Sequence, residues 1–303
     1  MVFSAYVQVT VKERFGGAMD VLTMFVIPAV VGVGIGILSG LLGVGGGTIM
    51  VPIFRLAFDM SPVMSTATSL FTIIPTSVSG AVSHIRHKTC VPALGVAAGL
   101  GGALTSPVGV WLAQISPAWM IMVAAALIIG WSAFKMLGKA IKLKKVPASA
   151  TAAQTKAAEG AADVARSGES DRDVPVKLTR KQLLIGVGIG LVAGIASGYV
   201  GVGGGFIMVP LMLSLVGIAM KQASGTSLIA VMILAIPGVI EQGLLGNINY
   251  LAGIAIAVGS IPGAIIGARL VRVVPERMLR FIFGGFLLVA AVLLVLNEFG
   301  ILS

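Results

Sequence analysis

The residues of this chain that could do chemistry lie in a glycine-rich stretch that occurs twice. Gly40 to Pro52 contains the run Gly43-Val44-Gly45-Gly46-Gly47, and Gly198 to Pro210 repeats it 158 residues later with ten of thirteen positions identical. Each copy interrupts a long apolar run and is followed by a short apolar piece. Two such copies favour discontinuous helices, whose exposed N–H groups point into a polar cavity and can bind an anion. The alternative is that the glycines only let helices cross closely.

Nucleotide binding, metal binding and catalysis are not indicated by this sequence. A dinucleotide fingerprint needs a preceding strand and an acidic residue about 20 positions later, and a P-loop needs Gly-Lys-Ser/Thr, but neither pattern is present. The sequence shows no Ser-His-Asp, Cys-His, paired intramembrane carboxylate or His-Glu-x-x-His arrangement, so we do not expect an enzyme. The lone Cys90 and the two histidines make no metal framework, and we expect neither a metal nor a cofactor.

Hydroxyl residues follow each glycine copy at the start of the next apolar span. They are Thr66-Ala67-Thr68-Ser69 in the first half and Ser224-Gly225-Thr226-Ser227 in the second. Helix N-capping or back-bonding to the preceding turn explains them as well as donation to an anion does. We predict a substrate site built from both copies, and its residues are Gly45, Gly46, Gly47, Thr48, Thr68, Ser69, Gly203, Gly204, Gly205, Thr226 and Ser227.

Four further residues are candidates for coupling or gating. Glu241 lies near the end of an apolar span, where a carboxylate is a functional candidate, although it is close enough to the Gly246-Asn247 turn to reach water. His84, matched by Gln242 in the second half, is either interfacial or takes part in proton coupling. Arg55 lies in the short apolar piece and either neutralises an anion or snorkels outward.

The elements that must position these residues are membrane-spanning helices. The chain is 57% hydrophobic and only 11% charged, with a mean hydropathy of +1.06, whereas soluble domains are about a quarter charged. Several apolar runs reach the roughly 20 residues that cross a bilayer. The 41 glycines indicate close helix packing and broken helices. We therefore predict an all-α integral membrane protein, and no cleavable signal peptide is evident in residues 1–20.

The apolar runs predict about five segments in each half of the chain. The first half has expected spans near residues 21–42, 65–83, 90–115 and 118–137, with the short piece 48–58 after the glycine break. The offset of 158 residues continues without a gap, so the same series is expected from about residue 183. The predicted regions are an N-terminal segment (1–20), a first transmembrane repeat (21–138), a basic linker (139–181) and a second transmembrane repeat (182–303).

Charge sets the expected topology. The linker 139–181 carries ten Lys/Arg and five Asp/Glu but no aromatic residue, which is typical of a disordered cytoplasmic loop and not of a nucleic-acid interface. Counting crossings from this loop places Arg86 and Lys88 inside. The four arginines of residues 269–280 also fall inside if each short piece counts as a crossing. The charges thus favour inverted repeats, although Lys12 and Arg14 then lie outside against the same rule.

The duplicated Gly-x-Gly-Gly-Gly-x-x-x-Val-Pro, with Thr-Ser early in the next span, resembles the sulfite exporter TauE/SafE family, also called TSUP. The resemblance covers residues 21–137 and 183–297. It implies a bacterial cytoplasmic (inner) membrane transporter that moves small sulfur-containing anions such as sulfite, sulfonates or sulfoacetate, mostly outward. Phe206 replaces Thr48 in the second copy, so the half-sites differ.

We expect a secondary transporter that works by alternating access. Its expected partners are this anion and the lipid bilayer, and no nucleic acid. A homo-oligomer is left open. The alternatives are an uptake permease, or a non-transporting membrane subunit or enzyme.

Overall fold

A computed structural model describes residues 25–142 and 178–298, and within these ranges the chain is helical and contains no strand. The predicted all-α class is confirmed. Five of the described helices are long and apolar enough to cross a membrane. The sequence-based segment 1–20 and most of the linker 139–181 lie outside the described residues, although helices α7 and α9 extend into the two ends of that linker. The elements, in chain order, are α3 (Ile27–Leu42), α4 (Gly47–Ala57), α5 (Pro62–Arg86), α6 (Pro92–Ile115), α7 (Ala118–Lys142), α9 (Arg180–Val200), α10 (Gly205–Leu211), the π-helical turn η4 (Met212–Val216), α11 (Met220–Leu244), α12 (Tyr250–Leu270) and α13 (Glu276–Glu298).

The internal duplication reappears in the helix boundaries. Helices α5 and α11 match at both ends when 158 residues are added to the first, and α4 is matched by α10 together with η4. The helix before each glycine break ends on a left-handed glycine, Gly43 with φ of 75° and Gly201 with φ of 72°. The offset therefore applies to the helices as well as to the sequence, and each half has the same order of a helix, a glycine break, a short helix and three further helices.

Glycine rows join the two halves through parallel helix pairs. On α3, Gly32 lies against Ile256 of α12 and Gly40 lies against Ala264, so contacts advance in the same direction on both helices. Helices α9 and α6 form the matching pair. A Cβ on Gly36 would lie 2.2 Å from the carbonyl oxygen of Ser260, so this backbone-to-backbone packing excludes any side chain. The close packing expected from the glycine content is therefore present.

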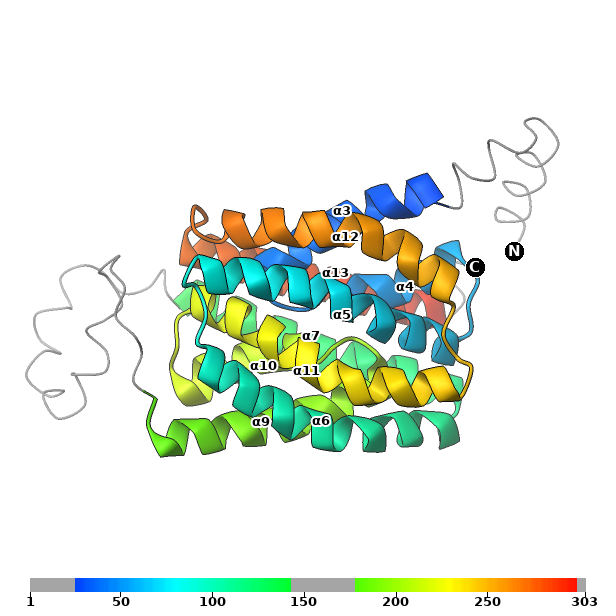
Figure 1. Cartoon of the computed structure of the whole chain (residues 1–303), viewed down its shortest axis with the longest axis horizontal. Helices are drawn as coiled ribbons and strands as arrows, with labels where there is room; N and C mark the ends of the chain where they lie inside the picture. Colours follow the sequence, from blue (N-terminus) through cyan, green and yellow to red (C-terminus); the bar gives the residue numbers. More distant parts are fainter. Residues whose placement is uncertain (1–24, 143–177, 299–303) are drawn as a thin grey trace, which may run out of the picture.

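Helices α5 and α11 lie in the middle of the bundle and run in opposite directions (Figure 1). Gly80 of α5 faces Leu228 of α11, and Gly238 of α11 faces Leu70 of α5. Residue numbers therefore rise along one helix as they fall along its neighbour. This pair of equivalent helices is thus antiparallel where the two halves touch. The inverted topology across a bilayer remains a prediction that this geometry supports.

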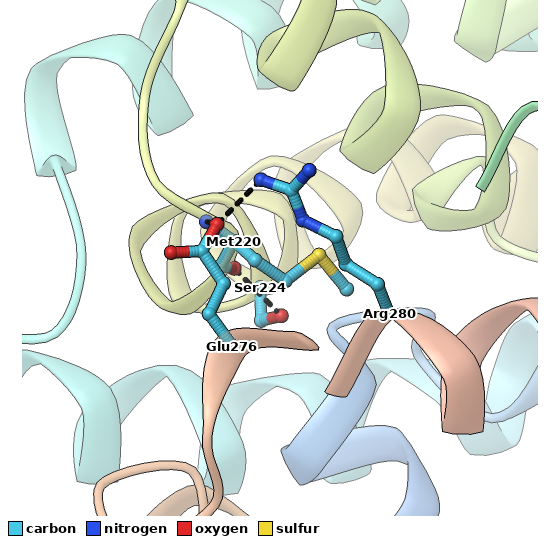
Figure 2. Close-up of polar contacts among 4 residues, drawn as sticks. All are labelled: Met220, Ser224, Glu276 and Arg280. Atoms are coloured by element: carbon cyan, nitrogen blue, oxygen red, sulfur yellow. Dashed lines mark hydrogen bonds and ion pairs between the residues drawn. The ribbon is translucent and has the colours of Figure 1, made fainter. Parts of the chain in front are cut away.

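The starts of the two central helices are held in different ways. Ser61 caps α5 from its own chain segment by accepting a hydrogen bond from the Met64 N–H. Helix α11 has no side-chain cap from its own N-cap residue. Instead the Glu276 carboxylate, from α13, accepts the Met220 N–H at 3.2 Å, and Arg280 pairs with the same oxygen at 2.5 Å (Figure 2). A carboxylate at a helix N-terminus also meets the positive end of the helix dipole.

Candidate functional site

The two glycine breaks meet at the centre of the bundle. A Cβ on Gly47 would lie 2.6 Å from the carbonyl oxygen of Val202, and one on Gly205 would lie 2.4 Å from that of Gly43. Only residues without a side chain allow the two backbones to approach so closely. The expectation that the fold brings the two copies together agrees with this geometry, and Gly45, Gly46, Gly203 and Gly204 of the predicted site lie in the same junction.

Each break starts a short helix whose first turn lacks a side-chain cap. The N-cap residues Gly46 and Gly204 are left-handed, with φ of 84° and 68°. In the first break, the N–H groups of Gly47 and Thr48 donate to no carbonyl or side chain among the described residues. Such groups carry the positive end of the helix dipole, so this start of α4 can bind an anion without a formal positive charge.

Two matching residues, one on α5 and one on α11, pack against both breaks. Ile73 would touch a Cβ on Gly45, Gly47 or Gly203, and Val231, its match in the second half, would touch one on Gly45 or Gly203. Both side chains are buried. One side of the junction of the breaks is therefore lined by two apolar side chains, one from each half.

The predicted hydroxyl residues have unequal roles. The hydroxyl of Ser227 donates 2.6 Å to the Gly43 carbonyl and also reaches the Ser224 carbonyl at 2.9 Å, so it holds the first break against α11. The match of Ser227 is Ser69, whose hydroxyl is buried and has no hydrogen-bond partner among the described residues. Ser69 is therefore the freer donor of this pair.

Thr68 and Thr226 tie the halves together. Thr68 accepts the N–H of Asn249 at 3.0 Å, just before α12, and Thr226 accepts the N–H of Val91 at 2.9 Å, just before α6. These contacts are equivalent under the 158-residue offset. The hydroxyl residues lie one to two turns inside their helices and are not N-caps, because α5 starts at Pro62 and α11 at Met220. Helix α5 thus begins earlier than the sequence indicated.

Several buried hydroxyls near the first break have no hydrogen-bond partner within the described part of the chain. A buried polar group without a partner calls for an explanation, and a bound ligand is one. The Ser77 hydroxyl lies 3.4 Å from a Cβ built on Gly45, and the Ser39 Cβ lies 3.5 Å from one built on Gly46. The unpartnered hydroxyls in the breaks or on the helices that pack against them belong to Ser39, Thr48, Ser69, Ser77 and Ser197.

Sequence reasoning missed Ser39, Ser77 and Ser197, although signals existed. Ser39 and Ser197 extend the duplicated stretch by one identical position on its N-terminal side. Ser77 follows Ser69 and Ile73 at intervals of four residues, which places all three on one face of α5. The second break offers fewer hydroxyls, since Phe206 stands in place of Thr48 and Ala235 in place of Ser77.

The candidates for coupling lie outside the junction of the breaks, although His84 bonds to Gly40 at the start of the first duplicated stretch. His84 is buried, and its Nε2–H donates 2.8 Å to the Gly40 carbonyl while Nδ1 accepts from the Thr89 hydroxyl at 2.7 Å. Both ring nitrogens are thus bonded within the protein, which favours a packing role, and proton coupling stays a prediction to be tested. Arg55 is half-buried in the last turn of α4, eight residues after Gly47, or about 12 Å along a helix.

Gln242 and Glu241 lie at the opposite end of the bundle from His84. The Gln242 side-chain oxygen accepts from Asn247 at 2.7 Å and from Gln114 at 3.4 Å. Glu241 is half-buried, and its Oε2 has no hydrogen-bond partner among the described residues. The described hydrogen bonds of Gln242 are all to residues outside the junction of the breaks.

The site is closed in this structure. Thr48, Ser69 and Ser77 expose none of their surface, and the glycines of both breaks are buried. An anion could reach these groups only after neighbouring helices move. Within the described residues, no group of three His, Cys, Asp or Glu side chains is arranged to hold a metal ion.

Comparison with known proteins gives a consistent result. The model of the family described as "Sulfite exporter TauE/SafE" matches residues 28–294. The probable membrane transporter protein YunE of Bacillus subtilis is 27% identical over 84% of this chain and 89% of its own length. The probable membrane transporter protein YdhB of the same organism is 26% identical over 81% of this chain and 90% of its own length. A probable membrane transporter protein of Haemophilus influenzae is 29% identical over 89% of this chain and 97% of its own length. No solved structure matches the chain significantly.

Proposed function

The chain belongs to the sulfite exporter TauE/SafE family, and on that premise we propose that it exports a small sulfur-containing anion of the sulfite, sulfonate or sulfoacetate type. It is a multi-pass membrane transporter, as its family and its five candidate spanning helices indicate. The observation that carries the proposed substrate class is the uncapped start of α4, with its free N–H groups and the unpartnered hydroxyls around it. We place the protein in the cytoplasmic (inner) membrane of a bacterium.

Neutral donors suit an anion that must bind and then leave. An anion brought to membrane depth loses hydration worth several kcal/mol or more, which fixed donors must replace. Each helix-end dipole supplies about 0.3–2 kcal/mol, and each charge-assisted hydrogen bond about 1.5–3 kcal/mol. A pyramidal or tetrahedral oxyanion presents several acceptor oxygens, which fit donors converging from α3, α4 and α5. No arginine or lysine at the break is needed to bind it.

Alternating access is the mechanism that we propose for crossing the membrane. The equivalent helices α5 and α11 run antiparallel, and the breaks meet beside Ile73 and Val231. If one half rocks against the other, the same central junction opens first to one face and then to the opposite face. The energy source in this scheme is an ion gradient or the membrane potential, and no nucleotide takes part.

Flux in proteoliposomes that contain only this protein tests the proposal. Sulfite, thiosulfate, sulfoacetate and taurine would be compared, first by thermal stabilisation of the detergent-purified protein and then by efflux. We expect one of these anions to stabilise the protein and to be moved by it. Protein that is well folded but moves none of them, in either direction, would favour a non-transporting subunit or an enzyme, while movement only inward would favour an uptake permease.

A further inference from the structure

A basic cavity lies between α5 and α12, at the end of the bundle where both helices finish. Its volume is about 360 Å³, within the range of about 300–1,000 Å³ that is typical of small-molecule sites. Arg86, His87 and Arg269 line it together with Ser83 and apolar side chains. The cavity lies outside the junction of the glycine breaks, and the proposed substrate site does not use it.

The two arginines come from different halves of the chain and meet because α5 and α12 are parallel. Thr72 of α5 bonds to Gly253 of α12, and Ser79 bonds further along to Ile261. Arg86 is the last residue of α5, and Arg269 lies in the last turn of α12. Both arginines are exposed, and neither forms an ion pair or hydrogen bond with another described residue. Two unneutralised guanidinium groups at one cavity favour an anionic occupant.

Buried polar groups on the cavity wall point to a ligand independently of these charges. Ser83 exposes only 4% of its surface, and its hydroxyl has no hydrogen-bond partner among the described residues. His87 donates its Nδ1–H to the Ser83 carbonyl at 2.6 Å, which leaves its Nε2 available. A phosphate oxygen in the cavity would satisfy the Ser83 hydroxyl and meet the arginines.

The duplication provides an internal comparison. The positions that match Arg86, His87 and Arg269 in the other half are Leu244, Leu245 and Trp111, and the position that matches Ser83 is Glu241. The two arginines and the histidine are thus matched by apolar or aromatic residues, and the buried hydroxyl by a carboxylate. Because the helix framework is otherwise duplicated, the fold does not require the basic set. The basic set is therefore present at one end of the bundle only.

The apolar side chains of the cavity wall bear on which kind of anion would fit it. Val82 and Ile261 line the cavity and are 42% and 37% exposed, and Ile85 and Ile266 on the same two helices are exposed as well. In a membrane protein such a surface faces lipid tails. The cavity thus joins a hydrocarbon-facing groove to a basic end, as an acyl chain with an anionic headgroup requires.

We propose that this cavity is a binding site for an anionic phospholipid. The phosphate lies between Arg86 and Arg269 and accepts from Ser83, while an acyl chain lies along Val82 and Ile261. The lipid would then bridge the two halves of the protein at one membrane surface. This inference requires only that the chain spans a membrane, and it holds whichever anion is transported.

Lipid binding to the detergent-purified full chain tests the proposal. Native mass spectrometry and thermal melting would compare phosphatidylglycerol with phosphatidylcholine of the same acyl chains. The test variant is Arg86→Gln with Arg269→Gln. The matched control is Arg272→Gln with Arg277→Gln, which removes the same charge from the same end of the bundle but outside the cavity. We expect phosphatidylglycerol to bind wild type and control alike, and the test variant at least about tenfold more weakly.

Three results would overturn the assignment. Equal binding of the two lipids by wild type would show that charge does not select the occupant. Equal loss in the control would show that net charge, not the cavity, attracts the lipid. Stabilisation by inorganic phosphate or sulfate that equals that by phosphatidylglycerol, and that requires the same arginines, would show a free-anion site instead. Ser83→Val, which removes one hydroxyl and keeps the charges, should weaken binding without a change in the preference for phosphatidylglycerol.

Discussion

The hydroxyl of Ser227 donates a 2.6 Å hydrogen bond to the carbonyl oxygen of Gly43, across the two halves of the chain. The equivalent residue, Ser69, is equally buried but has no hydrogen-bond partner among the described residues. Two positions that the duplication makes identical are thus used differently. The second half supplies the hydroxyl that bonds to the first break, and the equivalent hydroxyl of the first half has no bond of this kind.

This difference predicts opposite effects for the two alanine variants. Ser227→Ala removes a donor from a buried carbonyl, which costs about 1–3 kcal/mol of stability, so its melting temperature should fall. Ser69→Ala breaks no described hydrogen bond and should melt near wild type, but it should bind the transported anion about tenfold more weakly, equivalent to about 1.4 kcal/mol. Thermal melting and titration calorimetry check both. Equal affinity of Ser69→Ala and wild type would remove Ser69 from the site.

Gly46→Leu is predicted to abolish anion binding. At a φ of 84° any Cβ is strained, and here it would lie 3.0 Å from Ile35 and 3.1 Å from Met50, so the start of α4 must shift. Gly34→Leu is the control, because a Cβ at Gly34 has no neighbour within 4 Å. Both variants would be checked by size-exclusion and melting before calorimetry. Wild-type affinity in a folded Gly46→Leu protein would show that the break is only a packing device.

Most of the fold could be predicted because its signals are local or repeated. Apolar run length gives the spans, and the 158-residue offset gives the two halves. The predicted helix ends are less accurate. The sequence predicts a span from about residue 65, whereas α5 begins at Pro62, where the Ser61 side chain caps it. Its hydroxyl residues are therefore predicted at a helix start, whereas they lie one to two turns inside.

The candidate site could be predicted only in part. The glycines were identifiable because a repeated break is rare in apolar sequence. The use of each hydroxyl depends on contacts between residues far apart in sequence, such as Thr68 with Asn249 and Thr226 with Val91, and no single-sequence pattern reveals these. Arg86 and Arg269 were counted as topology signals in the sequence, and only the parallel packing of α5 on α12 brings them to one cavity.

Inverted topology is testable by labelling single cysteines in a Cys90→Ala background. Ser116 and Gly246 are predicted outside, and Ala158 and Arg277 inside. Gly246 and Arg277 are exposed, so their labelling should depend on which side of the membrane they face and not on burial within the protein. An impermeant maleimide applied to intact cells should mark only Ser116→Cys and Gly246→Cys. Labelling of Arg277→Cys while Ala158→Cys stays protected would contradict the inversion.

The native Cys90 should itself react slowly. It lies between α5 and α6, and burial raises the pKa of its thiol from 9.0 to about 11. Since the thiolate is the reactive form, only about one thiol in ten thousand is ionised at pH 7, and the maleimide rate should rise about tenfold per pH unit up to about pH 10. The measurement is the labelling rate of detergent-purified wild-type protein between pH 7 and 10. A rate at pH 7 equal to that of an exposed introduced cysteine would contradict the burial of this thiol.

The last prediction decides whether His84 takes part in proton coupling. Its match in the second half is Gln242, and both ring nitrogens are bonded, to the Gly40 carbonyl and the Thr89 hydroxyl. Glutamine can donate to one partner and accept from the other, so His84→Gln should keep the melting temperature and change flux less than about threefold. His84→Ala leaves both partners without their bonds and should lose about 1–3 kcal/mol of stability for each. Flux in proteoliposomes with and without an imposed pH gradient separates the roles. If His84→Gln is as stable as wild type but no longer responds to the gradient, the histidine carries the proton and the packing role is wrong.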